Sequence, residues 1–259
     1  RSVHVTASGY QQFEEDFQGE VMKPKIGFNT DVFVEDSGRT VTRMNILYSD
    51  LIIQHGGIPV IFPPGVLPQE VASGLDGFFL IGGDDYKCSL PASGEIPDRY
   101  LEVHPRREET DLNWASWLIK SDLPVLGVCG GLQALCWAAG GTIYGDIESE
   151  VKDPIQHRRI GKGDLPSHIV QWHGFQGGGL PPGSFEVNSS HHQSVATLPT
   201  DWRILASTSD GIIEACCDPA ERIIGIQWHP ELNREEPLGH FILNRFIEQV
   251  RSRLELDSA

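Results

Sequence analysis

Short apolar runs alternate with helix-like patterns along most of this chain, and this alternation limits the possible folds more than any other feature. The runs cover residues 25–29, 58–62, 77–83, 123–128, 202–208, 211–217 and 222–228, and each is typical of a buried strand. Apolar residues at helical spacing cover 44–52, about 106–121 and about 237–252. Strands that are separated by helices usually pair in parallel, because a parallel connection needs a long crossover. The sequence therefore predicts an α/β fold with a mainly parallel sheet and helices on both faces.

The two ends of the pattern define the expected domain. We assign residues 23–259 to a single domain, since 259 residues with 39% hydrophobic content can bury a large core. Residues 1–22 are polar and acidic, and we expect them to form a poorly ordered tail. The segment 160–200 is rich in Gly, Pro, His and Ser, which predicts loops and short strands near a rim of the sheet.

The charge of the chain narrows its expected partners. Acidic residues outnumber basic ones by 36 to 20, which gives a formal net charge of -16. Such a surface repels phosphate backbones and anionic membranes, so we expect neither a nucleic acid nor a membrane as a partner. No apolar run reaches the roughly 20 residues of a membrane span, and the first residues lack the apolar core of a secretory signal. A small-molecule partner is the remaining expectation.

The cysteines indicate a reducing environment. The chain has five of them, Cys88, Cys129, Cys136, Cys216 and Cys217. An odd number with two adjacent residues is a poor disulfide framework, and the chain has no CxxC pair of the kind that holds structural zinc. We therefore predict a cytoplasmic protein.

One cysteine has the setting of a nucleophile. The stretch LPVLGVCGGLQALCWAAGG (123–141) begins as a strand, turns around Cys129 and continues as an apolar helix. The helix N-terminus favours a thiolate at Cys129, and the glycines on both sides permit a tight turn. The amide of Gly130 can then donate to an oxyanion, as in the nucleophile elbow of hydrolases. A buried structural cysteine is the competing interpretation, because the pattern is short.

A histidine and a glutamate near the other end of the chain favour the catalytic interpretation. In RIIGIQWHPELN (222–233), His229 and Glu231 follow an apolar strand and lie two residues apart, so both can point to the same side. Glu231 can orient the imidazole of His229, which can take the proton of Cys129. A satisfied core histidine and a helix-capping glutamate are the alternatives for these two residues.

A glycine pair ends the run 77–83. The amide of Gly83 can approach a ligand closely and form a two-donor oxyanion hole with that of Gly130, where each donor is worth roughly 2.7–4 kcal/mol. Taken alone, this motif is better explained by a plain turn. Asp84 and Asp85 follow, as part of a solvated turn or as partners for a cationic group on the substrate.

Together these segments resemble the class I glutamine amidotransferase-like family, in its γ-glutamyl-γ-aminobutyrate hydrolase (peptidase C26) branch. The resemblance covers about residues 23–250. It is carried by KPKIGFNTD, HGGIPVIFPP, GVCGGLQALCWAAGGTIYGDI, VNSSHHQSV, and DGIIEACC followed by IIGIQWHPE. It implies a flavodoxin-like sheet, a Cys129–His229–Glu231 triad, and an oxyanion hole at Gly83 and Gly130. It also implies that Gln133 contacts the glutamyl group of the substrate. Four further residues fall on the loop that lines the substrate cleft in the family: Ser190, His191, His192 and Gln193.

The implied activity is hydrolysis of a γ-glutamyl amide through a glutamyl thioester, in a role such as polyamine catabolism. The alternatives are a glutaminase subunit that delivers ammonia to a separate synthase and a catalytically silent binding module on the same fold. We expect no cofactor and no metal, because His191 and His192 are neighbours on an extended segment and point apart. A homo-oligomer is compatible with the sequence.

Two departures from the family pattern concern the leaving group. Gly130 replaces the usual Arg after the nucleophile, and DDYKCSLP replaces the usual acidic-proline turn. With Asp84, Asp85 and Tyr86 at the opposite lip, we expect an acidic cleft mouth that favours a cationic leaving amine over γ-aminobutyrate.

Overall fold

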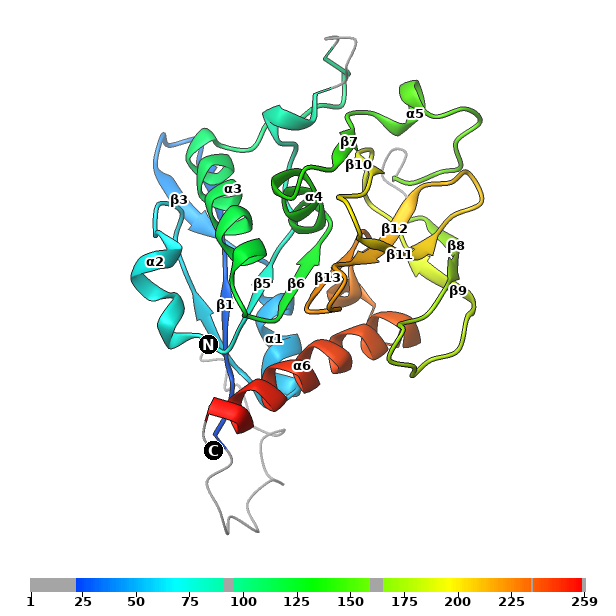
Figure 1. Cartoon of the computed structure of the whole chain (residues 1–259). Coiled ribbons are helices and arrows are strands. Elements are labelled where there is room, and N and C mark those ends of the chain that lie inside the picture. The colour runs from blue at the N-terminus through cyan, green and yellow to red at the C-terminus, as the bar shows by residue number, and fades with distance from the viewer. Residues whose placement is uncertain (1–21, 91–95, 159–164, 234, 258–259) are drawn as a thin grey trace, which may run out of the picture.

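The computed structural model of the chain describes residues 22–90, 96–158, 165–233 and 235–257. Eleven strands of the described residues form one mixed sheet (Figure 1). Its parallel part contains, in spatial order, β4 (Ile58–Ile61), β1 (Lys25–Phe28), β5 (Gly77–Leu80), β6 (Val125–Val128) and β13 (Ile223–Ile226). The antiparallel part continues from β13 through β12 (Ile213–Cys217), β11 (Arg203–Ser207), β8 (Ser167–Trp172) and β9 (Gly183–Asn188). Off this path, β10 (Ser194–Thr197) joins β12 to β7 (Thr142–Tyr144).

Helices cover both faces of the parallel part because its strands are apolar on both sides. Phe78 and Leu80 of β5 pack into one core, whereas Phe79 between them packs into the other. The first core is closed by α3 (Pro105–Lys120) and α4 (Gly130–Ala138), and the second by α1 (Ile46–Gln54) and α6 (Pro237–Asp257) (Figure 1). Full burial of β5, β6 and β13 on two faces explains why they are uninterrupted apolar runs in the sequence.

The helix ends follow local signals in the sequence. The side chain of Asn45 accepts a hydrogen bond from the backbone of Leu47 and caps α1. Pro105 occupies the first turn of α3, where its missing N–H costs nothing. Short helical segments complete the connections: α2 (Pro68–Val71), η1 (Ala72–Gly74), η2 (Lys87–Ser89), α5 (Ile147–Glu150) and η3 (Pro230–Leu232).

The predicted fold class is confirmed, with two additions. Each of the seven predicted strands corresponds to a strand of the sheet, and the four predicted helices, including the one after Cys129, correspond to α1, α3, α4 and α6. The hairpin of β2 (Asp31–Val34) and β3 (Thr40–Arg43) was not predicted, because its strands are short and mostly exposed. The antiparallel pairing of β12, β11, β8 and β9 was not predicted either, although β11 and β12 match predicted strands and the segment 160–200, where β8 and β9 lie, was expected to hold loops and short strands.

Two expectations concern the ends and the surface of the chain. Most of the tail predicted at residues 1–22 lies outside the described residues. Within the described part of the chain, no helix combines the length and the apolarity that crossing a membrane requires.

Candidate active site

Cys129 lies at a sharp turn between β6 and α4, as the sequence predicted. Its backbone has φ 52° and ψ -113°, a conformation that residues with a side chain rarely adopt. The turn is held on one side by the Cys129 amide, which donates to Ile226 O at 2.8 Å. It also depends on close packing, since a Cβ on Gly131 would lie 2.0 Å from the carbonyl oxygen of Leu80. The glycine after the turn therefore lets α4 begin directly against β5.

His229 and Glu231 lie at the end of β13, the strand that pairs with β6. Glu231 Oε1 is 2.8 Å from His229 Nδ1. The imidazole lies next to Cys129 beside Gly82, where an added Cβ would be 3.0 Å from Cys129 Cβ and 3.4 Å from His229 Cε1. Burial alone would lower the pKa of His229, but the Cys129 sulfur and the Glu231 carboxylate raise it well above its ordinary value. Burial and the Glu231 carboxylate also raise the pKa of Tyr48, whose hydroxyl lies 3.3 Å from His229 Nδ1. The arrangement can hold an imidazolium between a carboxylate and a thiolate.

Two amide side chains that the sequence analysis did not single out position these groups. Asn188 brackets the backbone of His229: its Nδ2 donates to His229 O at 2.7 Å, and its Oδ1 accepts from His229 N at 3.1 Å. Gln227 Nε2 lies 3.4 Å from Cys129 Sγ. Both residues stand inside quoted motifs, VNSSHHQ and IIGIQWHPE, but only the fold brings them next to Cys129 and His229.

Arg107 holds the Gly82–Gly83 turn in place through hydrogen bonds. The buried Arg107 guanidinium donates to the carbonyl oxygens of Gly82 at 2.9 Å and Ile81 at 3.2 Å. In a trans peptide the N–H points opposite the preceding C=O, so the Gly83 N–H points away from Arg107. Gly130 lies on that side, since a Cβ placed on it would be 3.3 Å from the Gly83 nitrogen. The Gly83 and Gly130 backbones therefore meet beside Cys129, as the oxyanion hypothesis requires.

Arg107 is itself held by a buried network. Its Nε donates to Asp111 Oδ2 at 2.8 Å, and the same oxygen accepts from the Tyr86 hydroxyl at 2.8 Å. Asn29 Nδ2 donates to the other oxygen of Asp111 at 2.8 Å, and Asn29 Oδ1 accepts from the Ile81 amide. Nothing in the local sequence HPRREE marks Arg107 as a residue of the site, because its role depends on contacts with β5.

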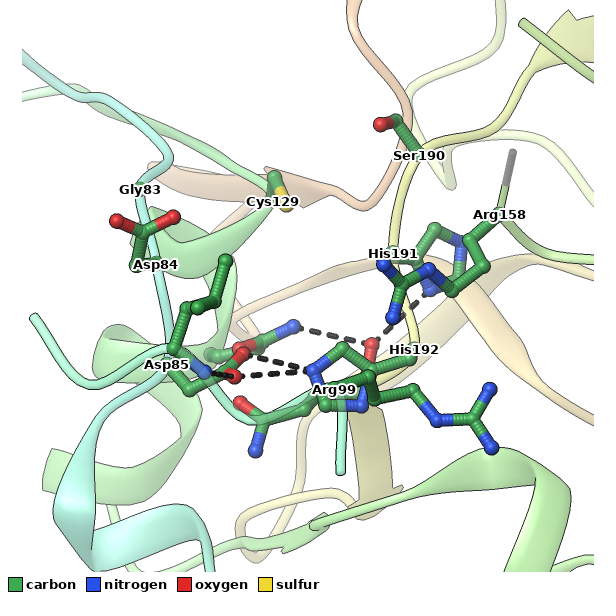
Figure 2. Close-up of a pocket in the computed structure, with 12 residues that line it drawn as sticks. Gly83, Asp84, Asp85, Arg99, Cys129, Arg158, Ser190, His191 and His192 are labelled. Atoms are coloured by element: carbon green, nitrogen blue, oxygen red, sulfur yellow. Dashed lines mark hydrogen bonds and ion pairs between the residues drawn. The ribbon is translucent and has the colours of Figure 1, made fainter. Parts of the chain in front are cut away.

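A cavity of about 270 Å³ opens in front of Cys129 (Figure 2). It is lined by all the substrate-side residues that the sequence analysis named, Asp84, Asp85, Gln133, Ser190, His191, His192 and Gln193, together with Gly83 and Cys129. Arg99, Leu101 and Arg158 also line it and were not predicted.

The polar lining residues differ in how firmly they are held. His192 Nε2 lies 3.0 Å from both carboxylate oxygens of Asp85, and both residues line the cavity (Figure 2). Gln193 is buried and braces the wall through Ser89 and Gly145. Gln133 donates to Gln193 O at 3.2 Å. Ser190 and Asp84 are exposed at the cavity and remain available to a ligand.

The expected charge of the cleft mouth needs correction. Tyr86 does not lie at the lip, since it is 2% exposed and its hydroxyl points inward to Asp111. The carboxylate of Asp85 is paired with His192, and Arg99 is paired with Asp146 and Glu148, whereas Arg158 brings a further positive charge to the same cavity. Desolvation, followed by the neighbouring carboxylates of Asp31 and Asp85, raises the pKa of Asp84. The mouth is mixed in charge, because the two arginines come from segments that no motif included.

Comparison with known proteins gives one family. The Peptidase C26 family model matches residues 26–231 of the chain. The γ-glutamyl-γ-aminobutyrate hydrolase PuuD of Escherichia coli K12 is 29% identical over 227 residues, which cover 81% of this chain and 87% of the relative. Protein NtpR of Enterococcus hirae is 28% identical over 218 residues, which cover 78% of this chain and 86% of the relative.

A solved structure agrees with the fold. The crystal structure of a glutamine amidotransferase from Thermotoga maritima aligns with a TM-score of 0.53 and 14% identity, covering 90% of this chain and 97% of that chain. At that identity the likeness concerns the fold alone. The family match, which spans both Cys129 and His229, is the finding that assigns the sequence: the chain belongs to the Peptidase C26 family.

Proposed function

We propose that the protein is a cysteine hydrolase of γ-glutamyl amides, with Cys129 as nucleophile, His229 as general acid and base, and Glu231 as the residue that orients His229. One observation carries the proposal. Cys129, which follows β6, and His229, which follows the neighbouring β13 and is held by Glu231, lie next to each other beside a cavity lined with polar groups. Membership of the Peptidase C26 family supports the same class of reaction.

In the first half of the proposed reaction, the Cys129 thiolate attacks the side-chain carbonyl carbon of the glutamyl group. The electron pair of the C=O bond moves to oxygen, and the resulting oxyanion accepts hydrogen bonds from the Gly83 and Gly130 amides. Collapse of this intermediate breaks the C–N bond. His229, with Nδ1 held by Glu231, donates its Nε2 proton to the departing amine.

The second half releases glutamate. Neutral His229 takes a proton from a water molecule in the cavity, and the water oxygen attacks the carbonyl carbon of the thioester. The C–S bond breaks, and the thiolate is restored beside the imidazolium. Because Gln227 donates toward the sulfur from 3.4 Å, it supports the thiolate in both halves.

The cavity offers groups of both signs to a γ-glutamyl moiety, which carries an ammonium and a carboxylate. Asp84 lies beside Gly83 on one side of the cavity and Arg158 near His191 on the other (Figure 2). We assign the ammonium to Asp84 and the carboxylate to Arg158. Because the charged groups at the cavity are of both signs and largely paired, as Asp85 is with His192 and Arg99 with Asp146 and Glu148, γ-glutamyl-γ-aminobutyrate and γ-glutamyl diamines are both candidate substrates.

The test is release of free glutamate from glutamine, γ-glutamyl-γ-aminobutyrate and a γ-glutamyl diamine by the purified protein. We expect turnover of at least one conjugate at a higher kcat/KM than glutamine. Cys129→Ala should abolish this turnover, whereas Cys136→Ala should retain it, since Cys136 is buried on α4 away from the cavity.

The other outcomes distinguish the alternatives. Turnover of glutamine alone would favour an ammonia-delivering glutaminase subunit. A folded protein that releases no glutamate from any of the three compounds, and whose Cys129 is alkylated by iodoacetamide no faster than Cys136, would favour a silent binding module. Activity that survives in Cys129→Ala would refute the proposed nucleophile.

A further inference from the structure

Behind the loop 189–193 lies a buried cluster that the proposed reaction does not use. Three imidazoles converge on one carboxylate oxygen, Glu214 Oε1: His157 Nδ1 at 3.4 Å, His168 Nε2 at 3.2 Å and His191 Nε2 at 3.4 Å. All four side chains are at least nine-tenths buried. Among the residues that the structure describes, none of these ring nitrogens and neither oxygen of Glu214 has a hydrogen-bond partner of good geometry.

The outer contacts of two imidazoles fix which nitrogens carry hydrogen. His191 Nδ1 lies 3.0 Å from the carbonyl oxygen of Gln193, which only accepts, so Nδ1 must carry the proton of a neutral ring. Its Nε2 then points a lone pair at Glu214. His157 Nε2 lies 2.9 Å from Asp210 Oδ2, which gives the same result for His157 Nδ1. In their neutral forms both rings therefore point a lone pair at the buried carboxylate. Either a second proton on an imidazole, which the raised pKa of His157 beside Glu214 and Asp210 favours, or a bound cation must lie between them.

We propose that a divalent transition-metal cation, with zinc as the best fit, binds between Glu214 and the three imidazoles His157, His168 and His191. Imidazole nitrogen and carboxylate oxygen are ordinary zinc ligands. At bond lengths of about 2.0–2.2 Å, neighbouring ligands of a tetrahedral ion stand about 3.3–3.5 Å apart, close to the three observed separations. The ligand atoms of His157, His191 and Glu214 already lie within 4.8 Å of one another, and His168 Nε2 lies 3.2 Å from the same Glu214 oxygen as a fourth candidate ligand.

The outer contacts have the form that metal-bound histidines require. A ligating imidazole normally donates its second N–H to a carboxylate or a backbone carbonyl, which orients the ring. Asp210 serves His157 in this way, and Gln193 O serves His191. The oxygen of Asp210 that accepts from His157 also accepts the Ile155 amide, so this outer contact is anchored in turn.

The proposed ion has a structural role next to the active site. It would join β12, β8 and the segment at His157 to the loop that lines the cavity. His191 also donates from its backbone to His157 O at 2.9 Å, and Glu214 O accepts the amide of Gln227 at 2.8 Å. A fully protein-filled, buried shell leaves no position for a substrate, which is the mark of a structural metal site.

The sequence analysis expected no metal because adjacent histidines point apart. His191 and His192 do point apart, toward Glu214 and Asp85 respectively. The three other proposed ligands are far from His191 in the chain, so no sequence spacing indicated the cluster.

The experiment measures metal content and needs no substrate. The full chain is purified without a histidine tag, stripped with a chelator, and titrated with ZnCl₂, with bound zinc measured by mass spectrometry after desalting. We expect about one zinc per chain and, at 100-fold excess over Kd, a rise in Tm of roughly 5–10 °C. Glu214→Gln and His157→Gln should lose this zinc, and Asp210→Asn should bind it about 10–100-fold more weakly.

His173→Gln is the matched control, because His173 is exposed at the end of β8 and contacts Ser207 instead of the cluster. It should bind zinc as the wild type does. Folded wild-type protein that takes up no zinc and keeps its Tm would overturn the proposal and favour histidines protonated around Glu214. Zinc binding by Glu214→Gln, His157→Gln and Asp210→Asn that equals binding by the control His173→Gln would overturn it as well, because the ion would then bind elsewhere. Should the ligand variants fail to fold, the wild-type titration and Asp210→Asn still decide.

Discussion

Replacing Glu231 by Gln isolates the charge that holds His229 protonated. The glutamine can still offer an oxygen to His229 Nδ1 at the 2.8 Å now spanned by Glu231, and it fits the same buried space. What is lost is the negative charge, which favours the imidazolium. The Cys129 sulfur and Glu231 together raise the pKa of His229 well above its ordinary value, so removal of one of them should lower it.

The size of the change follows from hydrogen-bond energies. A hydrogen bond to a charged group contributes about 1.5–3 kcal/mol, and one between neutral groups about 0.5–1.5 kcal/mol. The difference, roughly 1–1.5 kcal/mol, corresponds to about one pKa unit at 1.36 kcal/mol per unit. The sign is fixed: the imidazolium loses its proton at lower pH in the variant, so the alkaline limb of kcat/KM moves about one unit toward acid.

Two measurements test this reasoning. The first is the pH profile of kcat/KM for the best γ-glutamyl amide, and the second is NMR titration of the His229 ring, which does not depend on turnover. Glu235→Gln is the control, because Glu235 is exposed on the same loop. An unchanged His229 titration in Glu231→Gln would refute the claim that the carboxylate charge sustains the imidazolium, and an equal shift in Glu235→Gln would assign the effect to the surface field.

Three further variants test the frame of the site. Gly131→Ala should prevent folding or lower Tm severely, because its Cβ would lie 2.0 Å from a backbone oxygen, whereas Gly74→Ala, with open space around it, should melt as the wild type does. Asn188→Ala removes both bonds to the backbone of His229 and should lower kcat at least tenfold with little change in KM; equal effects on both constants would contradict a positioning role. Arg107→Lys keeps the buried charge but loses the guanidinium hydrogen bonds to the carbonyl oxygens of Ile81 and Gly82. We expect kcat to fall by up to roughly 10²-fold, the loss expected for one oxyanion donor. An unchanged kcat in a folded protein would exclude this role.

The predictable part of the fold was the part with strong local patterns. The apolar runs of β5 and β6 are buried on both faces, so their sequence alone predicts parallel strands. Cys129 could be identified from the sequence because a nucleophile at a tight strand–helix turn needs small neighbours, and glycines stand at positions 127, 130 and 131. The strand β8 alternates buried and exposed residues, but in a segment where turn residues dominate. That composition predicted loops and short strands without the bounds or pairing of β8.

The unpredicted part of the site consists of residues that act through contacts across the sheet. Arg107 sits on the first turns of α3, where an arginine normally faces solvent, and only its burial against the glycine turn reveals its function. The grouping of His157, His168 and Glu214 likewise arises from the antiparallel half of the sheet, which the sequence did not predict. Which side chains meet across a sheet depends on the register of its strands, and the hydrophobic pattern of the sequence does not give that register.

The positive φ of Cys129 lowers the stability of the fold and at the same time holds the nucleophile in place for the reaction. A non-glycine residue held at φ 52° costs of order 1–3 kcal/mol, a large share of the stability of a typical domain. Glycine would occupy the position without that cost, so the fold by itself favours loss of the nucleophile. A lineage in which catalysis was no longer selected should drift toward glycine at this position, and persistence of cysteine there in other members of the family would indicate continued selection for the reaction.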